Sequence, residues 1–134
     1  MPESFPHEGV HVRLGISALH GIGVFACEAI KAGTNVFAPD QRELRWVPAS
    51  ILEERSIKAF QRALYQDFAI RCGDQLGCPS NFNLLSVGWY VNEPASGEEP
   101  NLTSTATFDL VAIRNIEVGE ELTISYTSFN EGAR

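Results

Sequence analysis

Positive charge is scarce in this sequence. Its 134 residues include 10 Lys and Arg against 17 Asp and Glu, which gives a formal net charge of −7 at pH 7. A general nucleic-acid binder needs clusters of Lys and Arg to hold phosphates, so direct nucleic-acid binding is not expected. The acidic balance is compatible with a basic peptide or protein partner, although solubility alone is the simpler explanation.

Long apolar runs and a secretion signal are also lacking. No run approaches the roughly 18 residues that a membrane helix needs. The first eight residues hold two prolines and two acids but no basic segment, which is unlike a signal peptide. We therefore expect an intracellular, cytoplasmic protein that does not cross a membrane. The length predicts a single domain over residues 1–134, with an N-terminal extension at 1–9 and a C-terminal tail at 127–134.

Cysteine is present but in a pattern that excludes two common uses. Cys27, Cys72 and Cys78 form an odd set without a close pair, so neither a disulfide framework nor a zinc module is indicated. We expect these thiols to be reduced and at least partly buried.

Short strand patterns dominate what is there. Hydrophobic alternation and β-branched residues predict strands at 10–14, 24–26, 35–37, 68–70 and 122–126, and a hairpin over 102–113 that turns near Phe108. Turn-forming residues predict loops at 15–23, 73–83 and 92–101, and residues 84–91 fit either a helix or a strand. Without regular alternation of strands and helices, the fold class expected is mostly β, or β-rich α+β.

One helix is predicted, over Pro48–Tyr65. Ser50 is the expected N-cap residue and Glu53 its capping-box partner, because this pair can satisfy the free N–H groups of a first turn. Apolar residues follow at roughly helical spacing.

Two further segments match known sequence motifs but lack the structural context that those motifs need. His7-Glu8-Gly9-Val10-His11 matches H-E-x-x-H, but zinc peptidases need it on a helix. Here a strand pattern continues through it, and strand positions four apart are about 13 Å apart. Gly21-Ile22-Gly23-Val24-Phe25-Ala26 matches a dinucleotide fingerprint, which requires a helix directly after it and further βαβ units. We expect neither zinc nor dinucleotide binding from these patterns.

Three blocks of the sequence together resemble the SET-domain family of protein-lysine methyltransferases. The first is the same glycine segment, followed by Ile30-Lys31-Ala32-Gly33-Thr34. The second is Tyr90-Val91-Asn92 with Pro100-Asn101, and the third is Gly119-Glu120-Glu121-Leu122-Thr123-Ile124-Ser125-Tyr126. The blocks stand in family order and span about residues 10 to 127. Glu93 and Pro94 depart from the family's His and Ser, and no cysteine cluster flanks the blocks, so a small SET domain without zinc-binding modules is implied.

This resemblance implies a fold of several small curled sheets, one main helix and a knot-like C-terminal segment. It implies that S-adenosylmethionine binds on one face and that the lysine of a protein or peptide enters a narrow channel from the other. The implied roles are cofactor binding for Gly21, Ile22, Gly23 and Asn92, catalysis for Tyr126, and lining of the substrate channel for Tyr90 and Ile124, with no metal.

The implied reaction is attack of a neutral lysine amine on the sulfonium methyl group. Tyr126, with a phenol pKa near 10, suits hydrogen bonding and orientation better than strong base catalysis. An inactive SET-like module that binds a peptide is the alternative, favoured by Glu93-Pro94 and opposed by Tyr126. A zinc peptidase through His7 and His11 is a distant third.

The substrate protein, the number of methyl groups added and the oligomeric state are left open by the sequence. Few residues follow Tyr126, so we expect the tail at 127–134 to fold over the site through Phe129, or a second subunit of a homodimer to cover it.

Overall fold

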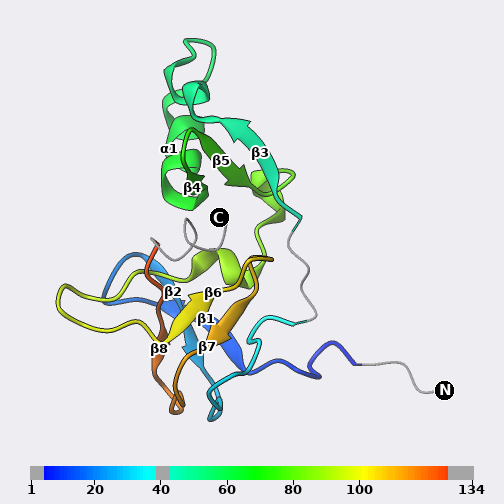
Figure 1. Ribbon diagram of the computed structural model, residues 1–134, viewed down its shortest axis with the longest axis vertical. Helices are drawn as coiled ribbons and strands as arrows, with labels where there is room; N and C mark the ends of the chain where they lie inside the picture. Colours follow the sequence, from blue (N-terminus) through cyan, green and yellow to red (C-terminus); the bar gives the residue numbers. More distant parts are fainter. Residues whose placement is uncertain (1–4, 39–42, 127–134) are drawn as a thin grey trace.

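The structure is a computed structural model that describes residues 5–38 and 43–126. Its strands form three small antiparallel sheets rather than one large one (Figure 1). The first sheet has the order β1-β2-β8, the second β3-β5-β4, and the third pairs β6 with β7. Their bounds are β1 Val12–Ile16, β2 Ile22–Ala26, β3 Arg45–Pro48, β4 Ile70–Cys72, β5 Gln75–Cys78, β6 Leu102–Ser104, β7 Leu110–Ala112 and β8 Glu121–Leu122. The expected mostly-β fold of small sheets is confirmed.

The single α-helix, α1, spans Ala59–Phe68 and lies beside the β3-β5-β4 sheet in the upper part of Figure 1. The predicted helix over Pro48–Tyr65 was wrong in its bounds, because Ala49–Glu53 forms a separate 3₁₀ turn and Glu54 is extended. Arg62 explains the break: its Nε donates to the Leu52 carbonyl at 2.7 Å and its Nη2 to the Glu54 carbonyl at 3.3 Å. These bonds take carbonyls that a continuous helix would pair with its own N–H groups.

The N-cap was also misplaced. No side-chain bond from Ser50 caps the 3₁₀ turn, and the helix begins after Lys58. There the Gln61 side chain accepts from the Lys58 N–H at 2.8 Å, which is one half of a capping box.

The predicted loop over 73–83 was wrong in part, since it contains β5. Gly77 suggested a loop, yet it lies opposite Trp46 of β3, and a Cβ there would come 3.1 Å from the indole ring. The glycine makes room for an aromatic ring of the neighbouring strand, a reason that only tertiary structure reveals.

The strands predicted at 10–14 and 24–26 form as β1 and β2 with shifted bounds. Those predicted at 68–70 and 122–126 were wrong in their bounds, because Phe68 ends α1, β4 begins at Ile70 and β8 covers only Glu121–Leu122. The hairpin over 102–113 forms as β6 and β7, with Phe108 at a φ of 64° in its turn. Residues 35–37 contribute an isolated bridge between Asn35 and Val111 in place of a full strand. The segment 84–91, which fitted either a helix or a strand, contains the short 3₁₀ helix Val87–Tyr90, and a second one, Phe82–Leu84, begins in the predicted loop before it.

The C-terminal segment runs through the core. Leu122 pairs with Val24 of β2, and isolated parallel bridges join Thr123 to Asn92 and Ile124 to Leu102. The largest fully buried side chains gather along this path: Leu102, Ile116, Leu122, Ile124, Val24 and Asn101. The end of the described chain thus lies among segments that come much earlier in the sequence, which is the expected knot-like arrangement. The tail at 127–134, including Phe129, lies outside the described residues.

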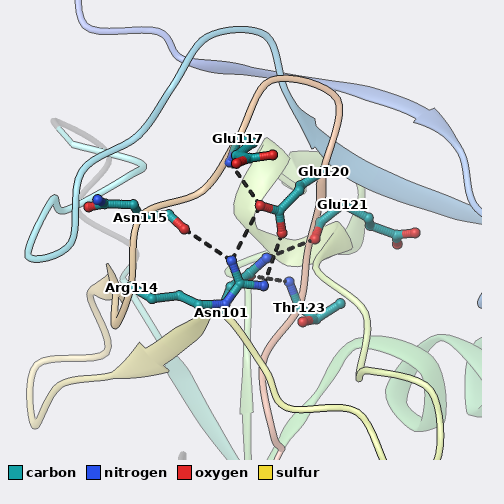
Figure 2. Close-up of polar contacts among 7 residues, drawn as sticks. All are labelled: Asn101, Arg114, Asn115, Glu117, Glu120, Glu121 and Thr123. Carbon is teal, nitrogen blue, oxygen red and sulfur yellow. Dashed lines mark hydrogen bonds and ion pairs between the residues drawn. The ribbon is translucent and has the colours of Figure 1, made fainter.

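Asn101 is the polar member of this core. Its Nδ2 donates to the Glu121 carbonyl at 2.9 Å and its Oδ1 accepts from the Thr123 N–H at 2.8 Å (Figure 2). The buried side chain thus replaces a strand partner for the C-terminal segment. At the outer end Arg114 pairs with Glu120 at 2.9 Å, and the hydrogen bond from Arg114 lowers the pKa of the Glu120 carboxyl.

None of the described helices is long and apolar enough to cross a membrane. The three cysteines form no disulfide. Cys78 is buried, which raises the pKa of its thiol to about 11, but Cys27 is exposed, contrary to expectation.

Asn101→Ala should lower the free energy of unfolding by about 3 kcal/mol or more, because it leaves two buried backbone groups unpaired at about 1–3 kcal/mol each. Asn115→Ala is the matched control: its exposed Oδ1 accepts from the Ala32 N–H, and losing that bond should cost about 1 kcal/mol. Denaturant titration of both variants measures the difference. Equal losses would show that Asn101 does not hold the C-terminal segment.

Candidate functional site

A cavity of about 540 Å³ opens between segments that are far apart in the sequence. That volume falls within the range of small-molecule and cofactor sites. Its walls come from the turn before β2, the end of α1, the 3₁₀ helix Val87–Tyr90 with the segment after it, and the C-terminal segment. The lining residues are Leu19, His20, Gly21, Ile22, Gln66, Asp67, Phe68, Trp89, Tyr90, Val91, Asn92, Glu93, Pro94, Ala95 and Tyr126.

Asn92 is a buried polar residue in the wall of this cavity, with 8% of its surface exposed. Its Nδ2 lies 3.1 Å from the His20 carbonyl, 3.2 Å from the Ile22 carbonyl and 3.0 Å from Oε2 of Glu121. Three acceptors around one nitrogen fix the orientation of the amide. The Oδ1 atom accepts no hydrogen bond from the described residues. An unpaired acceptor in a cavity wall suits a ligand that donates a hydrogen bond.

Glu121 links the cavity to the core. Its carboxylate accepts from Ser17 Oγ, at 2.8 Å from each oxygen, as well as from Asn92. Ser17 Oγ in turn accepts from the backbone N–H groups of Leu19 and His20 at 2.9 and 3.2 Å. The turn that supplies one cavity wall is therefore held by a carboxylate 104 residues later in the chain.

The two glycines of the first block have different reasons to be glycine. Gly23 is buried, and a Cβ there would collide with the Glu121 carboxylate. Gly21 has a φ of +49°, in the left-handed region that favours glycine, with open space around it. Gly21 lines the cavity and Gly23 does not.

Tyr126 closes one side of the cavity. Its hydroxyl donates to the Val91 carbonyl at 3.3 Å, and its backbone N–H donates to Oε2 of Glu93 at 3.2 Å. Burial raises the pKa of the Tyr126 phenol, and the negative charges of Glu93 and Asp67 raise it further. The phenol therefore stays protonated at neutral pH, as an orienting group requires.

The structure brings most of the predicted site residues to one cavity, and their roles remain predictions. Gly21, Ile22, Tyr90, Asn92 and Tyr126 line it. Ile124 does not; its side chain is fully buried in the core, so a place in a substrate channel has no support from the geometry. Gly23 does not line the cavity but leaves room for the Glu121 carboxylate, which bonds Asn92 in the cavity wall.

Sequence reasoning missed Ser17 and Glu121 as parts of the site. The sequence signal that could have found Glu121 was the joint presence of two blocks. The first contains Gly23, which has no room for a side chain, and the third contains Gly119-Glu120-Glu121.

The two misleading patterns are resolved by the backbone. Residues 6–9 form turns and His11 Nδ1 contacts Glu28 Oε1 at 2.6 Å, so H-E-x-x-H is not helical. Among the described residues no group of three or more His, Cys, Asp or Glu is arranged to hold a metal ion. The glycine segment runs directly into β2, a strand, where a dinucleotide fingerprint needs a helix.

Comparison with known proteins agrees with this geometry. The SET domain family model matches residues 21–127. The methyltransferase domain of human PR domain-containing protein 2 has a TM-score of 0.52 at 24% identity, over 86% of this chain and 76% of that one. A Plasmodium falciparum protein proposed to be a histone methyltransferase has a TM-score of 0.48 at 24% identity, over 87% and 93% of the two chains. No curated protein sequence matches the chain.

Gly23→Ala should destabilise the protein through a clash with the Glu121 carboxylate, by about 2 kcal/mol or more. Glu121→Ala removes the clashing group, so the double variant should be more stable than the sum of the two single losses predicts, by at least about 1 kcal/mol. Gly88→Ala is the control, since Gly88 is buried and, like Gly23, has no positive φ, but a Cβ there would meet only Phe37, at 3.4 Å.

Thermal or chemical denaturation of the four variants measures the coupling. Strict additivity would show that Gly23 is glycine for some reason other than Glu121.

Proposed function

The chain belongs to the SET-domain family, and on that premise we propose that it is a methyltransferase that uses S-adenosylmethionine to methylate a lysine side chain of a protein or peptide. The observation that carries this proposal is the buried Asn92 in the wall of a cavity of about 540 Å³, whose Oδ1 accepts no hydrogen bond within residues 5–38 and 43–126. The expected intracellular location remains part of the proposal.

The donors and acceptors of the cavity fit this cofactor. Its methionine end carries an ammonium group, which donates hydrogen bonds, and Asn92 Oδ1 is an acceptor that no donor of the described part of the chain occupies. Gly21 brings bare backbone to the same wall, so a ligand can approach closely there. Trp89, Tyr90 and Phe68 supply flat apolar surface that suits an adenine ring. When bound, S-adenosylmethionine would supply the activated methyl group.

The chain's own contribution to the reaction is alignment. A free lysine amine has a pKa of about 10.4 and must lose its proton before it can act as a nucleophile. The rings of Phe68 and Tyr90 lie 5.4 Å apart, edge to face, in the cavity wall, where they can limit the access of water and help to align the amine. The hydroxyl of Tyr126 donates a hydrogen bond to the Val91 carbonyl, and a hydroxyl oxygen is also able to accept one, which suits the orientation of an amine N–H.

A second function, a catalytically inactive SET-like module that binds a peptide, is favoured by one specific observation. Glu93 and Pro94 stand where the family has His and Ser, and the Glu93 carboxylate is engaged with the Tyr126 backbone. Cofactor binding and methyl transfer separate the two proposals.

The purified protein should bind S-adenosylmethionine, and its melting temperature should rise with ligand concentration by mass action. Asn92→Ala should weaken binding about tenfold or more, because the ligand loses its acceptor and the amide no longer braces the turn before β2. Asn83→Ala, at an exposed position outside the cavity, is the matched control. Calorimetry measures the cofactor affinity of the wild-type protein and of both variants. The absence of both binding heat and a melting shift at millimolar cofactor would contradict the proposal.

Tyr126→Phe should lower methyl transfer by roughly 10²–10³ while cofactor affinity and fold change little, since only one polar contact is lost and the ring still packs. Tyr65→Phe is the control, because Tyr65 packs edge to face on Phe82 and lies outside this cavity. The assay is transfer of labelled methyl groups to a lysine-rich protein mixture, run beside a binding titration.

Undiminished transfer by the Phe variant would remove Tyr126 from the mechanism. Binding without transfer by the wild-type protein would favour the peptide-binding module.

A further inference from the structure

The charges around the cavity are of one sign. Asp67 at the end of α1 and Glu93 after Asn92 both line it, and no Lys or Arg is among its described lining residues. The remaining titratable lining residues are His20, Tyr90 and Tyr126. The ion pairs among the described residues, His11–Glu28 and Arg114–Glu120, do not involve either lining carboxylate. Two carboxylates therefore line this site, and no Lys or Arg of the described residues forms an ion pair with either of them.

The uncharged part of the wall also favours a positive ligand. Four aromatic side chains line the cavity: Phe68, Trp89, Tyr90 and Tyr126. Aromatic ring faces attract cations, most strongly where water is partly excluded. The two carboxylates act on this wall electrostatically. The pKa of Tyr126 is raised first by burial and then further by the negative charges of Glu93 and Asp67.

Asn92 points to a cation independently of these charges. Asn92 lines the cavity and is more than nine-tenths buried; its amide nitrogen has three acceptors, and its amide oxygen accepts no hydrogen bond from the described residues. A hydrogen-bond donor that also carries positive charge satisfies the amide oxygen and the carboxylates together.

We propose that Asp67 and Glu93 make this cavity select the positively charged sulfonium cofactor over the neutral thioether that remains after methyl transfer. The inference rests on the proposed function. In the transfer a bond forms between the lysine nitrogen and the methyl carbon as the carbon–sulfur bond breaks, and the bonding electron pair stays on sulfur. The amine loses one proton to solvent before it attacks, and the positive charge of the sulfonium passes to the methylated amine. The ligand left in the cavity is therefore a thioether with one positive charge fewer and a nearly unchanged shape.

The consequence is a site that exchanges its ligand after each reaction. The carboxylates attract the sulfonium form and have no such attraction for the thioether, so the spent product is displaced by fresh cofactor. Glu93 stands where the family has His, so this selectivity is a property of this chain's departure from the family pattern.

The size of the effect is set by solvent. Both carboxylates are exposed, so water and salt screen them, and each is expected to favour the sulfonium by about three- to tenfold at low ionic strength. The preference should shrink above about 0.15 M salt, where charges interact over only about 8 Å.

The test is the ratio of two dissociation constants, for S-adenosylhomocysteine and for S-adenosylmethionine, measured by calorimetry at low salt. The wild-type ratio should be about ten or more. Asp67→Asn and Glu93→Gln should each lower it, and the double variant should bring it to about one or two by weakening the sulfonium ligand alone. Gln at position 93 keeps an acceptor for the Tyr126 N–H, so the variant removes charge without removing that hydrogen bond.

Two controls make the same charge change outside the cavity: Asp74→Asn, in the turn between β4 and β5, and Glu53→Gln, in the 3₁₀ turn before α1. Both should keep the wild-type ratio. A double variant with an unchanged ratio, or one that weakens both ligands equally, would overturn the inference.

The outcome also distinguishes this inference from the proposed function. Equal, measurable binding of both ligands by the wild-type protein would overturn the charge selection and leave the proposed function standing. Failure of the wild-type protein to bind either ligand would overturn the proposed function and this inference with it.

Discussion

The side chain of Asn101 holds the C-terminal segment inside the core, and the rest of the structure depends on that contact. It is bonded to the Glu121 carbonyl and the Thr123 N–H, two groups that would otherwise be buried without partners (Figure 2). With the backbone at 121–123 fixed, Leu122 can pair with Val24 and Ile124 can pack against Leu102. A single polar side chain thus gives the segment the pairing that a regular strand would obtain from a neighbour.

The same C-terminal segment also connects the core to the cavity. The Glu121 backbone is bonded in the core, while its carboxylate reaches Ser17 and Asn92 at the site. That carboxylate braces the turn before β2 through Ser17 and accepts a hydrogen bond from the amide nitrogen of Asn92, which lines the cavity. Core packing and ligand chemistry are therefore coupled through one residue, and the acidic, aromatic wall formed by α1 and the segment after Asn92 adds the preference for charge.

Local patterns predicted much of this arrangement. The hairpin of β6 and β7 has β-branched residues and a turn at Phe108, and its cross-strand partners are close in sequence. Such elements need little help from distant residues. The errors fall where distant groups decide. Arg62 separates the 3₁₀ turn from α1 through its bonds to the Leu52 and Glu54 carbonyls. Gly77, in a segment with the composition of a loop, lies in a strand where it leaves room for the ring of Trp46. Ile124 was predicted to line a channel because its motif suggested it, yet its position is set by packing against Leu102.

The sequence by itself determined the family, through three blocks in order, and with it the small-sheet fold and the candidate residues Gly21, Asn92 and Tyr126. Motif residues keep their identity wherever the chain places them, which is why they could be found without a structure. Only the tertiary structure decided that Gly23 makes room for a carboxylate, that Ser17 and Glu121 belong to the site, and that Asp67 and Glu93 face the same cavity. These relations join residues up to 104 positions apart. Such contacts arise from packing and from the pairing of buried polar groups, which leave no periodic signal along the chain.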